Sequence, residues 1–465
     1  MRVHLIAACG VGMSALAGLL REAGHDVTGS DEHVYPPAST LLEELGIPVL
    51  SGYDPARLDG VDLVVCGNAV RRTNAEAEAA EAKGLRMVSM PAALSELFLA
   101  KSSPLVVAGT HGKTTSSAML AWVLARTGRD PGFLVGGVPR ELRRSFALGG
   151  GRWFVVEGDE YDSAYFDKRP KFLHYRPAML LLNAIEFDHA DMYRDLAHVK
   201  SAFQQLLGIL PAGAPLVACG DFPHVLDVVA AAGGQARVLS FGLGDQNAWR
   251  VTDLTDDGAT TFTVRERGRA VCRVRLQPPG PINARNALGV MLIAAEVGVG
   301  WEEAAAALAD FRGVRRRQEV VGEAKGVTVI DDFAHHPTAV AGTLAALRAR
   351  YPGGRLRAVF EPRSNTSRRR VFQDEFVRAL ATADEAVLAQ VFTKASDPIP
   401  PEERLAPETL VSDLCARGVP ARVIDGPPAI RDYLVSSARP GDVIVVMSNG
   451  AFGGLPSLVA ESLGA

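Results

Sequence analysis

Short apolar runs alternate with longer alanine-rich segments over most of the chain. The runs are rich in valine, leucine and isoleucine, whereas the longer segments place apolar side chains at helical spacing. This alternation is typical of parallel sheets whose strands are joined by helices, so we predict an α/β fold. The first part of the chain predicts one Rossmann-like unit, with strands at residues 3–7, 26–29, 48–50, 62–66 and 86–89.

Two further series of strands follow. A polar break precedes the second series, which comprises residues 105–108, 153–156 and 178–182. Between residues 249 and 276 the apolar period shortens to two around a turn at Gly268, which predicts an antiparallel flap of the same domain. The third series comprises residues 327–330, 357–360, 386–389 and 443–447.

The chain of 465 residues is longer than a single hydrophobic core usually organises, and the three series divide it accordingly. We expect a Rossmann-like N-terminal domain, a central domain that includes the flap, and a Rossmann-like C-terminal domain. Closure around a ligand would use hinges near Ser102 and Gly313. The expected domains comprise residues 1–102, 103–313 and 314–465.

The composition argues against several function classes. Hydrophobic residues make up 48% and charged residues 22% of the chain, so each domain can bury a core. The net charge of −4 gives no overall field for nucleic acid or an anionic membrane, so we expect neither as a partner. The five cysteines are scattered without a CxxC pair, which favours a reducing cytoplasm. The apolar stretch between Arg2 and Cys9 is too short for an export signal.

A glycine-rich turn carries the strongest chemical signal. It lies between a predicted strand at residues 105–108 and a predicted helix at residues 116–126, which is the setting of a phosphate-binding loop. Lys113 would neutralise the β- and γ-phosphates of ATP, and Thr114 offers a hydroxyl to Mg²⁺. Ala108 replaces the usual first glycine, so a chance strand-to-helix turn is the alternative. The loop consists of Gly109, Thr110, His111, Gly112, Lys113, Thr114 and Thr115.

Two other predicted strands of the central domain end in groups suited to a metal. Glu157 follows the strand at residues 153–156, and Asn183 and His189 follow the strand at residues 178–182. Ligands of an open α/β sheet lie beyond the carboxyl ends of its strands, so we expect these groups and the loop to converge. Mg²⁺ takes mainly oxygen ligands, shared with phosphates and water. The alternatives are a solvated carboxylate for Glu157 and a hydrogen-bonded structural histidine for His189.

In this order the motifs resemble the Mur ligases of bacterial cell-wall synthesis, over essentially the whole chain. Within that family, one branch adds L-alanine to UDP-N-acetylmuramate and another, the murein peptide ligases, adds a recycled tripeptide. The chain is most similar to the tripeptide branch in residues 161–169, 361–366 and 447–454. The resemblance to the family rests on the phosphate loop, EGDEYD at 157–162, the segment 183–189, NARN at 283–286, the pair Arg316-Arg317 and DDFAHHP at 331–337.

The resemblance implies an ATP-dependent amide ligase. It would join UDP-N-acetylmuramate to the murein tripeptide L-alanyl-γ-D-glutamyl-meso-diaminopimelate through an acyl phosphate, in peptidoglycan recycling. Thr114 and Glu157 would hold one Mg²⁺ at the β- and γ-phosphates, and Glu157 and His189 would hold a second beside the acid substrate. The N-terminal domain would bind the UDP substrate, and the C-terminal domain the amine.

The resemblance also assigns nucleotide contacts. Asn283 and Asn286 would contact the adenine, Arg317 would reach the phosphates, and Asp332 with His336 would meet the nucleotide from the C-terminal domain. The catalytic group would be Lys113, Glu157, His189 and Arg317.

For two of these positions the residues alone leave alternatives open. Asn283 is compatible with a helix cap after Pro281, and residues 315–317 with an exposed basic linker. The family's histidine before Asn283 is Ile282 here, so that contact is absent.

The substrate-binding positions are carried by weaker signals. Residues 7–14 read AACGVGMS, which keeps only two glycines of the family's GxGGxGMS-like turn. Asp31 is equally compatible with a helix cap, and ordinary loop polarity is the alternative for the C-terminal positions. By position after predicted strands, the candidates for the UDP substrate are Gly10, Val11, Gly12, Met13, Asp31 and Asn68, and the candidates for the carboxylates of the tripeptide are Arg363, Ser364, Asn365 and Asn449.

Three other functions remain open from the sequence. One is a UDP-N-acetylmuramate:L-alanine ligase, and another is a related ligase of the folate or cyanophycin type. The third is a nucleotide-binding sensor without ligase activity. The altered glycines of the first domain permit a sensor, whereas Lys113, Glu157 and His189 oppose it.

Overall fold

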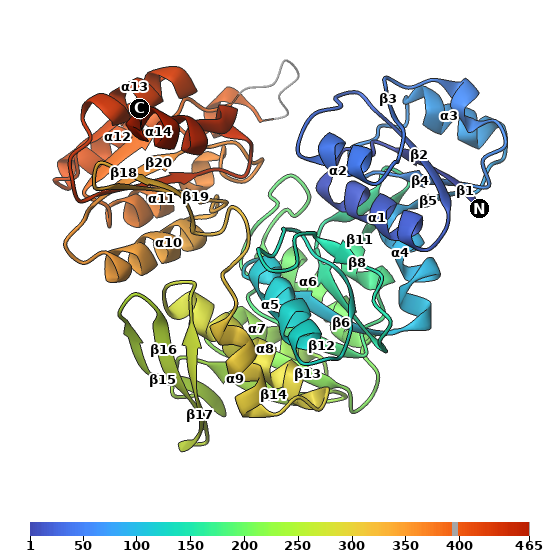
Figure 1. Cartoon of the computed structure of the whole chain (residues 1–465), viewed down its shortest axis with the longest axis horizontal. Coiled ribbons are helices and arrows are strands. Elements are labelled where there is room, and N and C mark those ends of the chain that lie inside the picture. Colours follow the sequence, from blue (N-terminus) through green and yellow to red (C-terminus); the bar gives the residue numbers. More distant parts are fainter. Residues whose placement is uncertain (393–398, 465) are drawn as a thin grey trace.

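The chain forms three lobes, each built on a main sheet of its own (Figure 1). The computed structural model describes residues 1–392 and 399–464. Most strands are parallel and are joined by helices, which confirms the predicted three-part α/β fold. The domain borders at residues 102 and 313 remain predictions. Within the described part of the chain, no helix has the length and apolar character needed to cross a membrane.

The N-terminal lobe contains a parallel sheet in the order β3-β2-β1-β4-β5. All five predicted strands are present, with bounds shifted by one or two residues. The strands are β1 (Arg2–Ile6), β2 (Asp26–Asp31), β3 (Val49–Ser51), β4 (Leu63–Cys66) and β5 (Met87–Ser89). The helices are α1 (Val11–Glu22), α2 (Ala38–Glu44), α3 (Ala75–Ala82) and α4 (Met90–Leu97).

The central lobe contains a mixed ten-stranded sheet in the order β17-β16-β15-β14-β13-β12-β6-β9-β7-β8. The three predicted strands are adjacent at its centre as β12 (Met179–Leu182), β6 (Ser103–Ala108) and β9 (Trp153–Gly158). Sequence reasoning missed β7 (Gly132–Leu134), β8 (Phe146–Ala147), β13 (Pro215–Cys219), β14 (Arg237–Gly242) and the separate hairpin of β10 (Asp162–Ala164) and β11 (Asp167–Pro170). The helices are α5 (Lys113–Arg126), α6 (Leu196–Gly208), α7 (Pro223–Ala231), α8 (Pro281–Glu296) and α9 (Trp301–Ala309).

The predicted antiparallel flap is confirmed as an extension of the central sheet. It consists of β15 (Trp249–Asp256), β16 (Thr260–Glu266) and β17 (Arg269–Leu276), which follow β14 in the sheet. The turn between the last two strands contains Gly268, whose φ of 89° suits glycine.

The C-terminal lobe contains a sheet in the order β18-β19-β23-β20-β21-β22, parallel except at β18. The four predicted strands form its interior as β19 (Val327–Asp332), β20 (Arg355–Phe360), β21 (Glu385–Leu388) and β23 (Asp442–Met447). The two partly exposed edge strands, β18 (Glu319–Ala324) and β22 (Ala421–Val423), were not predicted. The helices are α10 (Pro337–Arg350), α11 (Gln373–Leu380), α12 (Pro407–Ala416), α13 (Pro427–Ser436) and α14 (Leu455–Gly464).

The N-terminal and central lobes share a continuous apolar core. One hydrophobic cluster runs from Leu16 and Leu19 of α1 to Phe146 of β8 and Phe154 of β9. The helix lies so close to β8 that a Cβ at Gly18 would overlap the ring of Phe146. The first lobe is therefore fixed on the central lobe by packed side chains.

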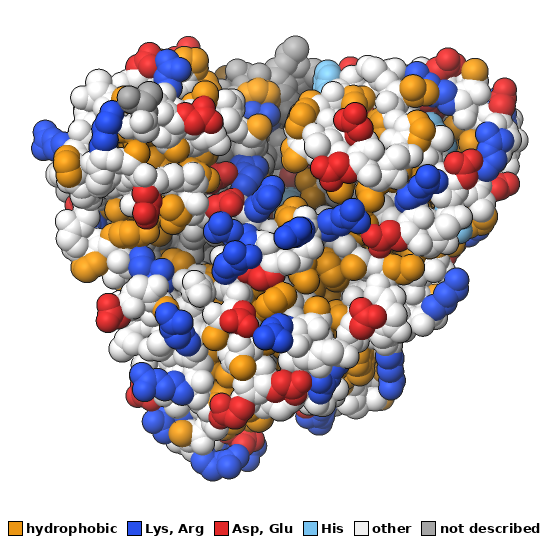
Figure 2. Space-filling view, in the orientation of Figure 1, with side chains coloured by type: hydrophobic (Ala, Val, Ile, Leu, Met, Phe, Trp, Pro, Cys, Tyr) orange, Lys and Arg blue, Asp and Glu red, His pale blue; other side chains and the backbone are white. Residues whose placement is uncertain are grey.

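Polar contacts and the stacked rings of Phe187 and Phe372 join the C-terminal lobe to the central lobe. The backbone N–H of Arg315 donates to the carbonyl of Val138 at 3.0 Å, and Arg350 of α10 forms an ion pair with Asp256 of the flap. Basic side chains gather where the three lobes meet, and the surface is hollowed between the N-terminal and C-terminal lobes (Figure 2).

The buried Glu76 of α3 provides a test of the N-terminal fold. Its carboxylate lies 3.3 Å from Nε2 of the buried His4, accepts from the backbone N–H of Asp54 at 3.0 Å, and bonds Ser30. Glu76→Ala would leave these groups unpaired, at a cost of about 2–4 kcal/mol. We expect the calorimetric unfolding midpoint to fall by roughly 5–10 °C. The exposed Glu78→Ala in the same helix should change it by about 1 °C or less, and equal shifts would contradict this role.

Candidate active site

Two positions in the phosphate loop require glycine. Gly109 has φ of 134°, and a Cβ there would lie 2.8 Å from the backbone nitrogen of Ala184. Gly112 has φ of 77°, and a Cβ there would lie 2.9 Å from side-chain atoms of both Asn183 and Asn286. The loop connects β6 to the first turn of α5, so strand, loop and helix are arranged as the sequence predicted. The helix begins at the loop lysine, three residues earlier than predicted.

Lys113 is held by two carboxylates that follow β9. Its Nζ lies 2.6 Å from Oε2 of Glu160 and 3.8 Å from Oδ1 of Asp159. Burial alone would lower the pKa of Lys113, but the charges of Glu160 and Asp159 outweigh burial and raise it. The lysine therefore presents a permanent positive charge at the loop.

Glu157 is a partly buried carboxylate near the carboxyl end of β9. Its oxygens accept from Oγ1 of Thr114 at 2.8 Å, from the backbone N–H of Gly136 at 2.6 Å and from Oγ of Ser117 at 3.4 Å. Burial, followed by the charge of Asp159, raises the pKa of Glu157. A cation beside this carboxylate would stabilise its charged form.

His189 has a left-handed backbone, with φ of 50°. Its backbone N–H donates to Oδ1 of Asp188 at 2.6 Å, and its ring Nε2 lies 3.3 Å from Oε1 of Glu160. Burial lowers its pKa, but the bond to Glu160 dominates and raises the pKa of His189 to about 9. Glu160 thus binds both His189 and Lys113. Sequence reasoning noted this glutamate in the acidic run after β9 but did not assign it a role.

The donor set at this edge of the sheet fits Mg²⁺. Thr114 and Glu157 are in contact, and Oδ1 of the neighbouring Asn183 is buried without a hydrogen-bond partner among the described groups. A hydroxyl, carboxylates and an amide oxygen are the hard donors that Mg²⁺ prefers. His189 faces Glu160 and Asp188, and these three groups have ligand atoms within 4.8 Å of one another.

Arg317 reaches this group from the start of the C-terminal lobe. Its Nη2 donates to Oγ1 of Thr114 at 3.2 Å, and its guanidinium lies 4.6 Å from the ring centre of Phe333. The side chain is partly buried against both lobes. The alternative of an exposed basic linker is therefore wrong for Arg317, although Arg315 is exposed.

His111, Glu186 and His336 meet at the boundary between the central and C-terminal lobes. Nε2 of His111 lies 2.6 Å from Oε2 of Glu186, and the two histidine rings are 4.5 Å apart. His336 caps α10, accepting from the N–H of Thr338 at 3.3 Å. Burial, followed by the charge of His111, lowers the pKa of His336 to about 4. Glu186 lies within the segment 183–189 that carries the family resemblance, but the sequence analysis did not assign it a role.

Asn283, Asn286 and Asp332 lie around the loop and the interlobe connection. Asn283 is inside α8, whose cap is Gly280, so the helix-cap alternative is wrong. Its Nδ2 donates to Oε1 of Gln318 at 2.9 Å. Asp332 accepts from the N–H of Gln318 at 2.7 Å, and Asn286 faces the phosphate loop.

The residues predicted for the UDP substrate lie at the carboxyl edge of the first sheet. Asp31 is the last residue of β2, and its carboxylate accepts from the backbone N–H groups of Cys9 at 2.8 Å and His33 at 3.1 Å. It therefore anchors the loop that follows β1 and does not cap a helix. Asn68 is exposed just after β4. The remaining residues form the start of α1, with Gly10 as its cap, followed by Val11, Gly12 and Met13.

The residues predicted for the amine substrate follow β20 and β23. Arg363 lies 3.4 Å from Glu361, and its guanidinium is 4.5 Å from the ring centre of Phe392. Asn365 donates to Oδ2 of Asp191 in the central lobe at 2.8 Å. The hydroxyl of Ser364 is hydrogen-bonded to that of Ser367. Oδ1 of Asn449 is buried and has no hydrogen-bond partner among the described groups.

Family models match all three lobes. The matches are a "Mur ligase family, catalytic domain" at residues 2–102, a "Mur ligase middle domain" at residues 107–294 and a "Mur ligase, glutamate ligase domain" at residues 316–450. The chain belongs to the Mur ligase family. It is therefore an enzyme, an ATP-dependent ligase.

Individual Mur ligases match over nearly their whole length. The chain is 42% identical to an Escherichia coli "UDP-N-acetylmuramate--L-alanyl-gamma-D-glutamyl-meso-2,6-diaminoheptandioate ligase", over 100% of this chain and 98% of that protein. It is 36% identical to a Burkholderia cenocepacia "UDP-N-acetylmuramate--L-alanine ligase", over 99% and 98% of the two chains. The crystal structure of a murein peptide ligase from Psychrobacter arcticus matches with a TM-score of 0.75 and 35% identity, over 100% and 99%.

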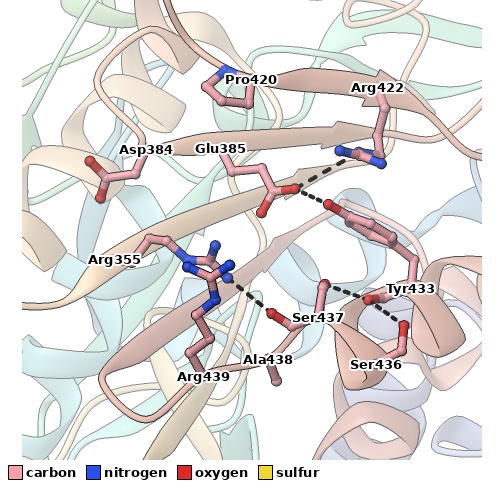
Figure 3. A pocket seen from close by; sticks show the side chains of 10 residues that line it. All are labelled: Arg355, Asp384, Glu385, Pro420, Arg422, Tyr433, Ser436, Ser437, Ala438 and Arg439. Atoms are coloured by element: carbon pink, nitrogen blue, oxygen red, sulfur yellow. Dashed lines mark hydrogen bonds and ion pairs between the residues drawn. The ribbon is translucent and has the colours of Figure 1, made fainter.

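A cavity of about 380 Å³ lies away from the ligase site (Figure 3). Its walls include Arg355, Glu385 and Arg422 at the amino ends of β20, β21 and β22, together with Tyr433 of α13. The positions predicted to bind the amine, Arg363, Ser364 and Asn365, follow the opposite, carboxyl end of β20. The cavity is therefore separate from the site proposed for this Mur ligase.

Gly112 provides a test of the loop geometry. Gly112→Ala combines a left-handed backbone with a clash against Asn183 and Asn286, so we expect at least a tenfold loss of ATP affinity by calorimetric titration. Gly128→Ala is the matched control, because φ is 74° there and a Cβ would meet nothing within 4 Å. The control should lose only about 1 kcal/mol of stability, with ATP affinity unchanged. If Gly112→Ala and Gly128→Ala bound ATP with equal affinity, ATP would not bind at the phosphate loop as proposed.

Proposed function

We propose that the chain joins UDP-N-acetylmuramate to L-alanyl-γ-D-glutamyl-meso-diaminopimelate at the expense of ATP. The main support is the convergence of Lys113, Thr114, Glu157 and Arg317 at one edge of the central sheet. This group presents cationic and metal-binding side chains where a nucleotide triphosphate would end. The flanking lobes offer separate edges for the acid and the amine.

The reaction needs an activated carboxylate, because a carboxylate does not react with an amine in water. In the first step the γ-phosphorus forms a bond to the carboxylate oxygen of the acid substrate, and its bond to the β-phosphate oxygen breaks. ADP leaves and an acyl phosphate remains. The amine nitrogen then attacks the acyl carbon, the bond to phosphate breaks, and the amine loses a proton as the amide forms.

The residues supply position and charge for these steps. Lys113 and Arg317 would bind the β- and γ-phosphates and neutralise the charge that moves to the leaving ADP. Thr114 and Glu157 would hold Mg²⁺, and His189 would join them as a ligand once it has released its proton. The ion would bring the phosphate and carboxylate oxygens together by neutralising them. Glu160 would keep Lys113 and His189 oriented until the substrates arrive.

The tripeptide is favoured over L-alanine as the amine. The relative named for the tripeptide reaction is 42% identical, whereas the relative named for the L-alanine reaction is 36% identical. The segments that resemble the tripeptide branch, residues 361–366 and 447–454, follow the adjacent strands β20 and β23. Arg363 in this region is a cation suited to a carboxylate of the tripeptide.

The product identifies the amine. Purified protein would be incubated with ATP, Mg²⁺, UDP-N-acetylmuramate and either the tripeptide or L-alanine, and the products weighed by mass spectrometry. We expect the tripeptide to be used at least tenfold faster, with ATP hydrolysis only when both acid and amine are present. A preference for L-alanine would overturn the tripeptide assignment. A rate of ATP hydrolysis that does not depend on UDP-N-acetylmuramate would overturn its assignment as the acid substrate.

Lys113→Ala tests the phosphate site. Loss of the charge at the γ-phosphate should lower kcat by roughly a hundred- to a thousandfold. Binding of UDP-N-acetylmuramate to the N-terminal lobe, measured by calorimetry, should stay within about twofold of wild type because Lys113 lies in another lobe. The exposed Lys101→Ala is the control and should retain full turnover. Near-normal turnover of Lys113→Ala would show that the phosphate site is elsewhere.

A further inference from the structure

The cluster of His111, Glu186 and His336 has the composition of a transition-metal site. The ligand atoms of the three residues all lie within 4.8 Å of one another. Two imidazoles and one carboxylate form a donor set that zinc uses in proteins, and imidazole favours Zn²⁺, Co²⁺ or Ni²⁺ over Mg²⁺. The cluster therefore differs in chemistry from the oxygen-rich group around Thr114 and Glu157.

Two atoms of the cluster are buried without a hydrogen bond. Nε2 of His111 and Oε2 of Glu186 form an ion-pair contact at 2.6 Å, but the contact lacks hydrogen-bond geometry and neither atom has another hydrogen-bond partner among the described groups. Buried polar atoms normally make hydrogen bonds, because a missing one costs about 1–3 kcal/mol. A metal ion bound to both atoms would satisfy them together.

Hydrogen bonds from neighbouring residues orient the side chains of Glu186 and His336, as is common around metal ligands in proteins. Oε1 of Glu186 accepts from Oγ1 of Thr338 at 3.1 Å, which leaves Oε2 available. Nε2 of His336 lies 3.2 Å from the carbonyl of Phe187, which can only accept, so this nitrogen carries the proton. Metal-binding histidines commonly donate their second N–H to such a carbonyl.

The remaining nitrogen of His336 is only weakly engaged. Its Nδ1 accepts from the N–H of Thr338 at 3.3 Å, longer than the usual value of about 2.9–3.0 Å. Ligand atoms about 2.0–2.2 Å from a tetrahedral metal lie roughly 3.4 Å apart, so small side-chain shifts would complete the site. The long contact to Thr338 is the one that the metal would replace.

We propose that His111, Glu186 and His336 form a binding site for a zinc-like divalent transition metal. The site joins the phosphate loop to the first turn of α10, and so connects the central lobe to the C-terminal lobe. A bound metal would tie the two lobes together in the nucleotide-free enzyme. Such a clip would stabilise the enzyme while restraining the loop that receives ATP.

Co²⁺ titration of untagged, metal-free full-length protein tests the site without nucleotide or substrates. Wild type should develop the visible absorption of tetrahedral Co²⁺ with one equivalent, and Zn²⁺ should displace it. His111→Ala and His336→Asn should each weaken Co²⁺ binding at least tenfold. The second substitution keeps a side chain that can cap α10. Zn²⁺ should raise the thermal unfolding midpoint of wild type and leave that of both variants unchanged.

Two controls separate this site from the other histidines and from the proposed Mg²⁺ site. His224→Ala removes a half-exposed histidine on α7 and should bind Co²⁺ like wild type. Glu157→Gln should also bind Co²⁺ normally. Loss of the Co²⁺ signal in Glu157→Gln with its retention in His336→Asn would overturn the proposal and place the ion at the Mg²⁺ site. An unaltered affinity in both histidine variants would overturn it as well. Neither result depends on the ligase reaction.

Discussion

One buried carboxylate holds together the side chains beside the phosphate loop of the central sheet. Glu160 lies within 3.3 Å of His189 and 2.6 Å of Lys113, two cationic groups that arrive from different strand ends. These cations raise the charge density of the site, and without the glutamate they would repel each other in a buried setting. Glu160 offsets these positive charges before ATP binds, so the folded protein can hold them close together at the site where ATP is expected.

The rest of the site is composite, because each lobe contributes only part of it. The central lobe provides the phosphate loop and the carboxylates, whereas Arg317 and His336 come from the C-terminal lobe and contact Thr114 and Phe187 across the boundary between the two lobes. The phosphate loop, the carboxylates and His336 follow the carboxyl ends of parallel strands, and Arg317 precedes β18, which runs antiparallel to β19. A ligase of this kind therefore depends on the positions of its lobes as much as on any single residue.

The sequence predicted the three central strands β6, β9 and β12 and the groups that follow them, but it missed the buried strands β7 and β13. β6, β9 and β12 are apolar throughout their interior, and the phosphate loop and Glu157 follow from that pattern. The edge strands β18 and β22 were missed because they are short or partly polar. The contact between His189 and Glu160, with Nε2 of His189 3.3 Å from Oε1 of Glu160, was not predicted. The family resemblance paired His189 with Glu157 around a second Mg²⁺, and that pairing stays a prediction. Such pairings depend on backbone geometry that apolar periodicity does not encode.

The close fit of Gly18 against Phe146 has a mechanical consequence. Opening the boundary between the N-terminal and central lobes would expose a continuous packed core, whereas the C-terminal lobe meets the central lobe through hydrogen bonds, ion pairs and a smaller apolar contact at Phe187. Separating the first two lobes would therefore cost more than shifting the third, so the first two lobes would move together as one rigid unit.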